Sequence, residues 1–181
     1  MDILDIGCGF RPYEGRPGID NVVTIDQNPR CNPTHTFEVI KGKQFPVKES
    51  SFDLIVASHF LEHVDDVPWC MEQIHRAGKP GSEVRITVPH FSAPSSYQDP
   101  THRRHLSSRC MDYFDSKKGL YECGYTTVDF RIQKAQSRFR NNITGFIRSI
   151  PSKLFGTRIH EKYISRFVPI AELYFELKVV K

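Results

Sequence analysis

The densest group of reactive side chains lies in the stretch "PHFSAPSSYQDPTHRRHLS", residues 89–107. Imidazole and carboxylate groups can take a proton from a hydroxyl or an amine while it reacts. Guanidinium groups can clamp a carboxylate or a phosphate of the substrate. We therefore predict catalytic roles for His90, Asp99 and His102, and substrate contacts for Tyr97, Arg103 and Arg104.

Two other interpretations of this stretch stay open. His90, Asp99, His102 and His105 could ligate a metal ion, although the last two share a face only if that piece is helical. Alternatively, Asp99 caps a turn at Pro100 and the arginines are solvated, which would make the stretch a plain connection. We predict no metal site.

A glycine turn near the start is the second chemical feature. In "MDILDIGCGFRPYEGRPGIDNVVTID", an apolar strand runs into Gly7 and Gly9. Glycine lets the backbone approach a ligand closely because no side chain intervenes. Asp26 comes 19 residues after Gly7, where a carboxylate accepts hydrogen bonds from two ribose hydroxyls. Together with Asp5, these residues predict a nucleotide-binding turn.

The loop after the glycines distinguishes two classes of ligand. A dinucleotide such as NAD rests its pyrophosphate on a helix N-terminus. Here Pro12 takes the third glycine position of that motif and has no N–H to offer. Two prolines and two glycines between Phe10 and Gly18 also prevent a full helix. S-adenosylmethionine has no phosphate and needs no helix dipole, so the sequence favours it over NAD.

Four short, nearly continuous apolar runs must position these residues. Such runs are typical of strands buried on both faces of a parallel sheet. They lie at Ile3–Ile6, Val22–Ile25, Leu54–Ala57 and Val84–Val88. A helix is predicted within "DDVPWCMEQIHRAGKPG", capped by Asp65 or Asp66. Ligands of such sheets bind beyond the carboxyl ends of the strands, where His90 also falls.

The rest of the chain completes the expected fold. "VDFRIQKAQ" and "ELYFELKVV" are predicted strands, and "NITGFIRSIPSKLF" is a predicted amphipathic helix broken at Pro151. We predict one domain over residues 1–181. Its α/β fold is a doubly wound, mostly parallel sheet with an antiparallel C-terminal edge strand, in three layers, α/β/α.

Four segments in order resemble a known family. "ILDIGCG", "TID", "FPVKESSFDLIVASHFLEHVDD" and "KPGSEVRITVPH" are similar to the successive motifs of class I S-adenosylmethionine-dependent methyltransferases, the type 11 group in particular. The shortened first loop and "DPTHRRHLS" resemble a subgroup of small predicted methyltransferases. The resemblance implies a Rossmann-like fold, S-adenosylmethionine as the cofactor and methyl transfer as the activity.

The same resemblance assigns cofactor roles to individual positions. The implied cofactor-binding residues are Asp5, Gly7, Gly9, Asp26, Gln27, Ser58 and His59. The glycines would pass beneath the methionine part, Asp5 would orient its ammonium group, and Asp26 would hold the ribose. Ser58, His59 and Phe60, which follow the third predicted strand, would line the end of the cofactor where the methyl group is transferred. Lys41 lies near the place of the family's usual acidic partner for adenine, so we expect backbone groups there to recognise the base.

Composition and charge limit the cellular location and the kinds of partner that the sequence allows. The five scattered cysteines are expected to be free thiols, and no signal segment or membrane span is recognisable, which predicts a cytoplasmic protein. Net charge is +4, yet residues 131–166 hold nine Lys or Arg against one acid, Glu161. We expect a lid or an interface, such as a homodimer surface, at about residues 138–169. A solvated helix face is the simpler explanation of this basic segment, and nucleic-acid binding is the alternative.

These observations predict an S-adenosylmethionine-dependent methyltransferase that acts on a small molecule, at an oxygen atom. Two alternatives stay open. One is a cofactor-binding module without transfer activity that serves as a partner subunit. The other is a nucleic-acid methyltransferase.

Overall fold

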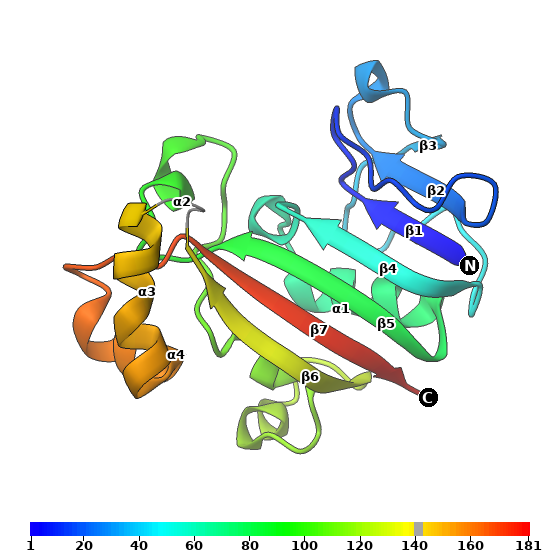
Figure 1. Cartoon of the computed structure of the whole chain (residues 1–181). Helices are drawn as coiled ribbons and strands as arrows, with labels where there is room; N and C mark the ends of the chain where they lie inside the picture. Colours follow the sequence, from blue (N-terminus) through cyan, green and yellow to red (C-terminus); the bar gives the residue numbers. More distant parts are fainter. Residues whose placement is uncertain (140–142) are drawn as a thin grey trace.

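Seven strands form one sheet in the order β3-β2-β1-β4-β5-β7-β6, as Figure 1 shows. The computed structural model describes residues 1–139 and 143–181. The strands are β1 (Asp2–Ile6), β2 (Asn21–Asp26), β3 (His35–Thr36), β4 (Phe52–Ser58), β5 (Gly78–Pro89), β6 (Asp129–Arg138) and β7 (Glu172–Val180). The α-helices are α1 (Val67–Ala77), α2 (Ser95–Gln98), α3 (Ile143–Phe155) and α4 (Thr157–Ile159). Short 3₁₀ turns lie at Pro29–Cys31, Leu61–His63, Cys110–Phe114 and Gly119–Cys123, and a π-helical turn at His160–Ile164.

The strand directions confirm the predicted doubly wound, mostly parallel sheet. Strands β3, β2, β1, β4 and β5 pair in parallel, and β7 runs antiparallel to both β5 and β6. The C-terminal strand pairs with the "VDFRIQKAQ" strand as expected, but the structure corrects its position, since β6 and not β7 forms the edge. Leu173, Phe175 and Leu177 are at most 1% exposed, and an internal position is what buries them.

The main hydrophobic core lies between the sheet and helix α1. Side chains alternate along a strand, so Leu4 and Ile6 of β1 join this core while Ile3 packs on the opposite face. Helix α1 contributes Met71 and Ile74, both 0% exposed. If β1 shifted by one residue against its neighbours, its side chains would exchange between the two faces of the sheet. The burial of these side chains therefore fixes the strand register.

Helices cover the two faces of the sheet unequally. In Figure 1 helix α1 lies behind the sheet, and among the described residues no helix covers the opposite face over β1 and β4. The loop that follows β1 lies there instead, and its Tyr13 packs with Val22 on Ile3, Leu54 and Val56. Over this part of the sheet, the third layer of the expected α/β/α arrangement is therefore a loop.

Helix α1 begins where the sequence predicts. Asp66 is its N-cap residue, and the Trp69 N–H donates to Asp66 Oδ1 at 2.8 Å. Pro68 lies in the first turn, where its missing N–H costs no hydrogen bond. The helix ends at Ala77, and the next residue already belongs to β5.

Removing this cap is expected to destabilise the fold modestly. In Asp66→Ala the Trp69 N–H loses its acceptor, and we expect the free energy of unfolding to fall by about 1 kcal/mol. Asp65→Ala is the matched control, because Asp65 pairs with Arg103 at the surface rather than with the helix end. Chemical denaturation measures both variants, and equal losses in the two would contradict the capping role.

Helices α3 and α4 join β6 to β7 at one end of the sheet (Figure 1). Helix α3 is continuous through Pro151, contrary to the predicted break. The proline removes one backbone hydrogen bond, and the carbonyl it frees belongs to Ile147, which is 58% exposed to solvent. Residues 140–142, which include Arg140 of the basic segment, lie outside the described residues. None of the described helices is long and apolar enough to cross a membrane.

Candidate functional site

The glycine turn lies at the carboxyl ends of β1 and β2. Gly7 and Gly9 have φ angles of 71° and 53°, left-handed values that glycine adopts at little cost. The Gly9 N–H donates to Asp26 Oδ2 at 2.9 Å, and the Asn28 N–H donates to Asp26 Oδ1 at 2.8 Å. Two backbone groups therefore fix the Asp26 carboxylate, which keeps lone pairs for further hydrogen bonds.

A cavity of about 290 Å³, the glycine-side cavity, opens beside this turn. It is lined by Gly7, Gly9, Ile25, Asp26, Gln27, Phe37, Val39, His59, Phe60, His63, Val64 and Thr101. The wall combines a carboxylate and an amide with apolar and aromatic surface. That mixture suits a ligand with a polar sugar and a flat base.

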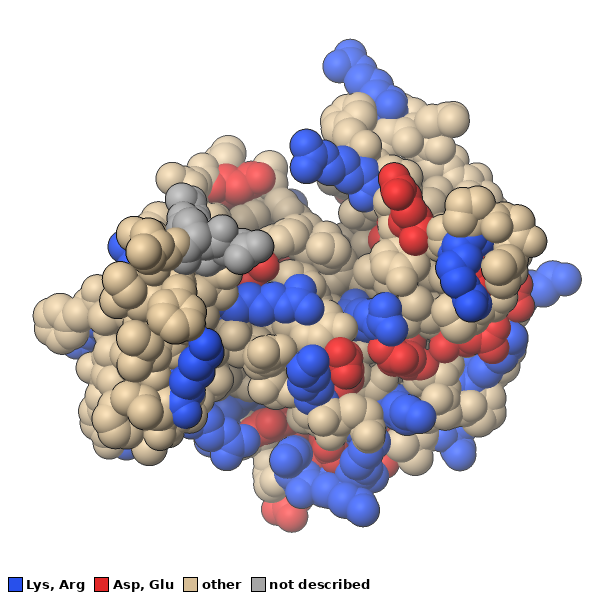
Figure 2. All heavy atoms as spheres, viewed as in Figure 1, with Lys and Arg blue, Asp and Glu red and all other residues tan. Residues whose placement is uncertain are grey.

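A second cavity of about 780 Å³, the sheet-face cavity, lies over the face that lacks a helix. It is lined by Asp5, Gly7, Cys8, Gly9, Phe10, Arg11, Tyr13, Val56, Ser58, His59, Arg85, Thr87, Arg138 and Tyr174. Basic and acidic side chains gather side by side over this face of the sheet in Figure 2. Gly7, Gly9 and His59 line both cavities, so ligands in the two would meet at these residues.

Asp5 anchors the loop that replaces a helix. It is 3% exposed, and the Tyr13 N–H donates to its Oδ2 at 2.8 Å. Burial raises the pKa of this carboxyl, while the hydrogen bond from Tyr13 works in the opposite direction. The predicted contact of Asp5 with an ammonium group stays a prediction.

His59 carries a positive charge where the two cavities meet. Its Nε2 lies 3.4 Å from Glu172 and its Nδ1 lies 3.4 Å from Glu62. These carboxylates raise the pKa of His59 to about 10, so the ring is protonated at neutral pH and cannot serve as a general base. Its φ of 51° is unusual for a residue with a side chain, and such strain is concentrated at functional sites.

His90 is not brought to either cavity. It is 0% exposed at the end of β5. The Ser92 N–H donates to its Nδ1 at 3.0 Å, and its Nε2 lies 3.2 Å from Glu161 Oε2. Both ring nitrogens thus have partners inside the protein, and the geometry does not bring His90 to a ligand, so its catalytic role stays a prediction that the two cavities do not support.

Asp99 and His102 lie close to the glycine-side cavity, although neither lines it. Asp99 accepts hydrogen bonds from the hydroxyl and the N–H of Thr101, which lower its pKa. The His102 ring lies edge-on to His63, with centroids 4.7 Å apart. Thr101 and His63 themselves line the cavity, so they connect the predicted residues to it.

The predicted substrate residues point elsewhere. The side chains of Arg103 and Arg104 donate to the carboxylate and the carbonyl of Asp65, respectively. Tyr97 is 62% exposed and stacks on a neighbouring histidine ring. None of the three lines either cavity, so the structure does not assemble the predicted substrate clamp there.

Several residues that were not predicted as site residues lie at the cavities or beside predicted ones. Arg85, Arg138 and Tyr174 line the sheet-face cavity, and Glu62 and His63 lie together with His102. The alternation of polar and apolar residues in "VRITV" could have located Arg85. Its neighbours Val84 and Ile86 are buried against the core, so the Arg85 side chain must point to the opposite face of the sheet. The four-residue metal set is not formed, since the potential ligand group found among the described residues contains His102 without His90, Asp99 or His105.

Comparison with known proteins identifies the family. A family model described as "Methyltransferase domain" matches residues 1–124. The chain belongs to this family of methyltransferase domains. S-adenosylmethionine is the cofactor that this family of methyltransferase domains implies.

Solved structures of methyltransferases agree with this assignment at the level of the fold, and one curated relative matches part of the chain. Among curated proteins, mitochondrial arginine-hydroxylase NDUFAF5 of Homo sapiens is 36% identical over 87 residues, which are 42% of this chain and 25% of that protein. The match thus spans about a quarter of that relative's length. A methyltransferase in complex with the Haloferax volcanii Trm112 methyltransferase activator superposes with a TM-score of 0.60 at 14% identity, over 99% of this chain and 82% of that chain. A SAM-dependent methyltransferase from Aquifex aeolicus gives 0.57 at 14% identity, over the same shares.

The residues of the glycine turn fit the cofactor. A Cβ placed on Gly9 would meet no atom within 4 Å, so the turn leaves open space for a ligand. The Asp26 carboxylate is held by backbone N–H groups at the same cavity that Phe37 and Val39 line with apolar surface, which suits a ribose and a base, although these contacts stay predictions. The Lys41 side chain pairs with Asp66 and lines neither cavity, so the structure does not place it where it could contact adenine in the glycine-side cavity.

Proposed function

We propose that this methyltransferase domain transfers a methyl group to a hydroxyl oxygen of a small anionic molecule. The observation that carries the proposal is the pair of cavities that share Gly7, Gly9 and His59. The adenosine part of the cofactor would occupy the glycine-side cavity, held by Asp26 and Gln27. Its sulfonium would then lie at the junction, with the acceptor in the sheet-face cavity.

The lining of the sheet-face cavity supports an anionic acceptor. Arg11, Arg85 and Arg138 all line it, and guanidinium groups bind carboxylate and phosphate well. Arg85 is paired with Glu83 at 2.6 Å, whereas Arg138 lies 3.6 Å over the ring of Tyr174. Arg138 therefore offers its donors to a ligand more readily than Arg85 does.

Methyl transfer of this kind is an in-line displacement that depends mainly on alignment. The acceptor oxygen forms a bond to the methyl carbon, the bond from that carbon to sulfur breaks, and S-adenosylhomocysteine leaves. The hydroxyl proton is released during the reaction. His59 cannot take it while it is protonated, so Asp99 and His102 stay the proposed candidates.

An acceptor screen tests the proposal. S-adenosylhomocysteine release would be measured with hydroxylated small molecules supplied in pairs, one with and one without a carboxylate or phosphate. We expect release with the anionic members, and Arg138→Ala should raise their KM with little change in cofactor affinity. Transfer only to RNA, or binding of S-adenosylhomocysteine without transfer to any acceptor, would overturn the proposal in favour of one of its alternatives.

His102→Ala is expected to lose most methyl transfer and to keep its affinity for S-adenosylhomocysteine. The reason is that His102 lies beside Glu62, which is 3.4 Å from His59 at the junction of the two cavities, and does not itself line the glycine-side cavity. We expect turnover to fall by about 100-fold or more. Single-turnover kinetics and calorimetry measure the two effects, and unchanged turnover would remove the catalytic role.

A cofactor-binding subunit without transfer activity is the second candidate. Its support is the face of the sheet that carries a loop in place of a helix, since such a face could be completed by a partner. The methyltransferase that superposes on this chain was solved with an activator protein. Homodimer formation stays a prediction, to be checked by light scattering.

A further inference from the structure

A fully buried carboxylate without a hydrogen bond lies beside the glycine-side cavity. Glu62 is 0% exposed, in the 3₁₀ turn Leu61–His63 that follows β4. Among the residues that the structure describes, no donor makes a hydrogen bond to either of its carboxylate oxygens. His59 lies at ion-pair distance but is not aligned to donate, and it also faces Glu172. One imidazole ring thus faces two carboxylates, so even a charged His59 leaves one negative charge of the pair unbalanced, and a bound cation would offset the cost of burying it.

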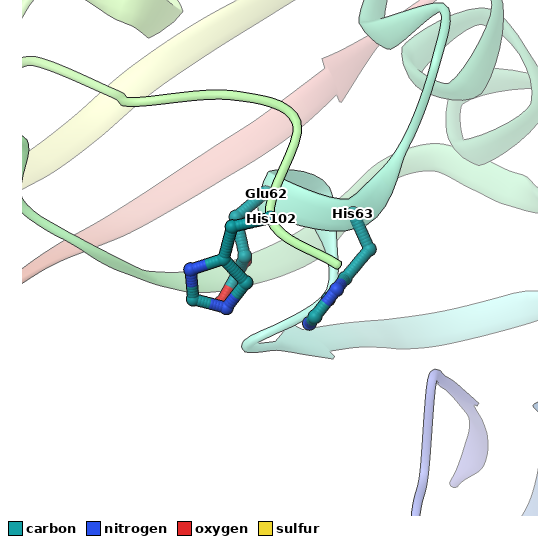
Figure 3. Close-up of side chains that lie close together, drawn as sticks. All are labelled: Glu62, His63 and His102. Atoms are coloured by element: carbon teal, nitrogen blue, oxygen red, sulfur yellow. The ribbon is translucent and has the colours of Figure 1, made fainter. Parts of the chain in front are cut away.

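Two histidines complete a group around this carboxylate. One ligand atom from each of Glu62, His63 and His102 lies within 4.8 Å of the other two. In Figure 3 the three side chains project to the same side of the chain, two from the turn after β4 and one from the loop after α2. Both histidines are half-buried, so the group is open on one side.

Hydrogen bonds fix the proton on the same nitrogen of both rings. Thr101 donates its only hydroxyl proton to Asp99 at 2.6 Å, so in the 2.9 Å contact with His63 the ring Nδ1 must be the donor. His102 Nδ1 lies 3.1 Å from the carbonyl oxygen of Ser96, which can only accept. The proton on Nδ1 leaves Nε2 as the nitrogen of each ring that can ligate a metal ion. Proteins orient metal-binding histidines in this way.

We propose that Glu62, His63 and His102 bind a divalent transition-metal ion such as Zn²⁺. Two imidazoles and one carboxylate, with further positions open, form the ligand set of catalytic zinc sites and of non-haem iron sites. Mg²⁺ fits less well, because it prefers oxygen ligands. The proposal goes beyond the proposed function and does not rest on it. It differs from the sequence-based prediction of no metal site, and metal binding decides between the two. A bound ion would occupy His102 Nε2 while Nδ1 faces the Ser96 carbonyl, so in the metal-bound protein Asp99 would be the candidate that accepts the hydroxyl proton.

The backbone holds the two segments of this site together. The N–H groups of Arg103 and Arg104 donate to the carbonyl oxygen of Glu62 at 2.8 and 3.0 Å, which ties the loop of His102 to the turn of Glu62. An ion bonded to two ligands at about 2.1 Å each spans no more than about 4.2 Å, so the side chains must close slightly as it binds. Because His63 lines the glycine-side cavity, the ion would lie at the wall of that cavity.

Metal titration of the full chain, without cofactor or acceptor and free of any affinity tag, tests the proposal. We expect Co²⁺ to develop visible absorption, Zn²⁺ to displace it, and calorimetry to count one ion per chain. Saturating Zn²⁺ should raise the unfolding midpoint by roughly 5 °C. No binding at millimolar ion would overturn the proposal, and so would a thiolate–cobalt charge-transfer band, because the cysteines would then be the ligands.

Variants locate the ion. Glu62→Gln, His63→Ala and His102→Ala should each weaken binding more than about 100-fold, since even outer-shell changes cost 10- to 100-fold. Thr101→Val removes only the hydrogen-bond partner of the His63 Nδ1–H, so it should weaken metal binding by about 10- to 100-fold. His105→Gln is the matched control in the same loop and should bind Zn²⁺ as the unmodified chain does. Folding is checked by circular dichroism, and wild-type affinity in folded Glu62→Gln or His63→Ala would overturn the assignment.

Discussion

Asp26→Asn is expected to weaken the binding of S-adenosylhomocysteine by about 10- to 100-fold. In the structure each Asp26 oxygen already accepts one backbone N–H, from Gly9 and from Asn28. The lone pairs that remain are the ones available to two ribose hydroxyls. An asparagine has one acceptor oxygen, so it must give up either a backbone group or a hydroxyl. Hydrogen bonds to a charged partner contribute about 1.5–3 kcal/mol, which corresponds to the expected loss.

Calorimetry with S-adenosylhomocysteine measures this loss, and Asp20→Asn is its matched control. Asp20 lies directly before β2, and Asp26 is the last residue of that strand. Asp20, however, pairs with Arg16 and lines neither cavity. The control should therefore bind the ligand within about twofold of the unmodified chain. Equal affinity in all three proteins would place the ribose away from Asp26 and remove the basis for assigning the glycine-side cavity to adenosine.

The part of the site that could be predicted from sequence is the part set by strand ends. Gly7, Gly9, Asp26 and His59 each follow a short apolar run, and parallel strands bring their carboxyl ends to one edge. For these residues the local hydrophobic pattern is sufficient, because pairing of the strands in the sheet brings them together. The doubly wound sheet was predictable for the same reason, since its strands are continuous apolar segments.

The loop after β5 could not be predicted in this way. His90, Tyr97 and Arg103 have suitable chemistry, but their direction depends on partners that are remote in sequence, such as Glu161 for His90. The position of β7 likewise depends on the sheet edge left open by β5, which no local pattern encodes. Glu62 was part of a quoted motif, yet its burial without a partner is a property of the folded chain alone.

The two glycines of the turn are expected to respond differently to the same substitution. Gly7→Ala should lower the free energy of unfolding by about 2–5 kcal/mol, from a left-handed φ and from overpacking. A Cβ at Gly7 would lie 2.6 Å from a ring carbon of Phe60 and 3.0 Å from its Cβ, so Phe60 has to move. Phe60 follows His59 and lines the glycine-side cavity, so this movement would also disturb the junction of the two cavities.

Gly9→Ala isolates the effect on the ligand. A Cβ at Gly9 meets no atom within 4 Å, so only the left-handed φ opposes it, at about 1–2 kcal/mol. The added methyl group projects into space that the cofactor is expected to use, and we expect S-adenosylhomocysteine affinity to fall by about tenfold or more. Chemical denaturation and calorimetry on both variants measure the two effects. A larger loss of stability in Gly9→Ala than in Gly7→Ala, or undiminished affinity in Gly9→Ala, would mean that the open space above Gly9 is not where the ligand lies.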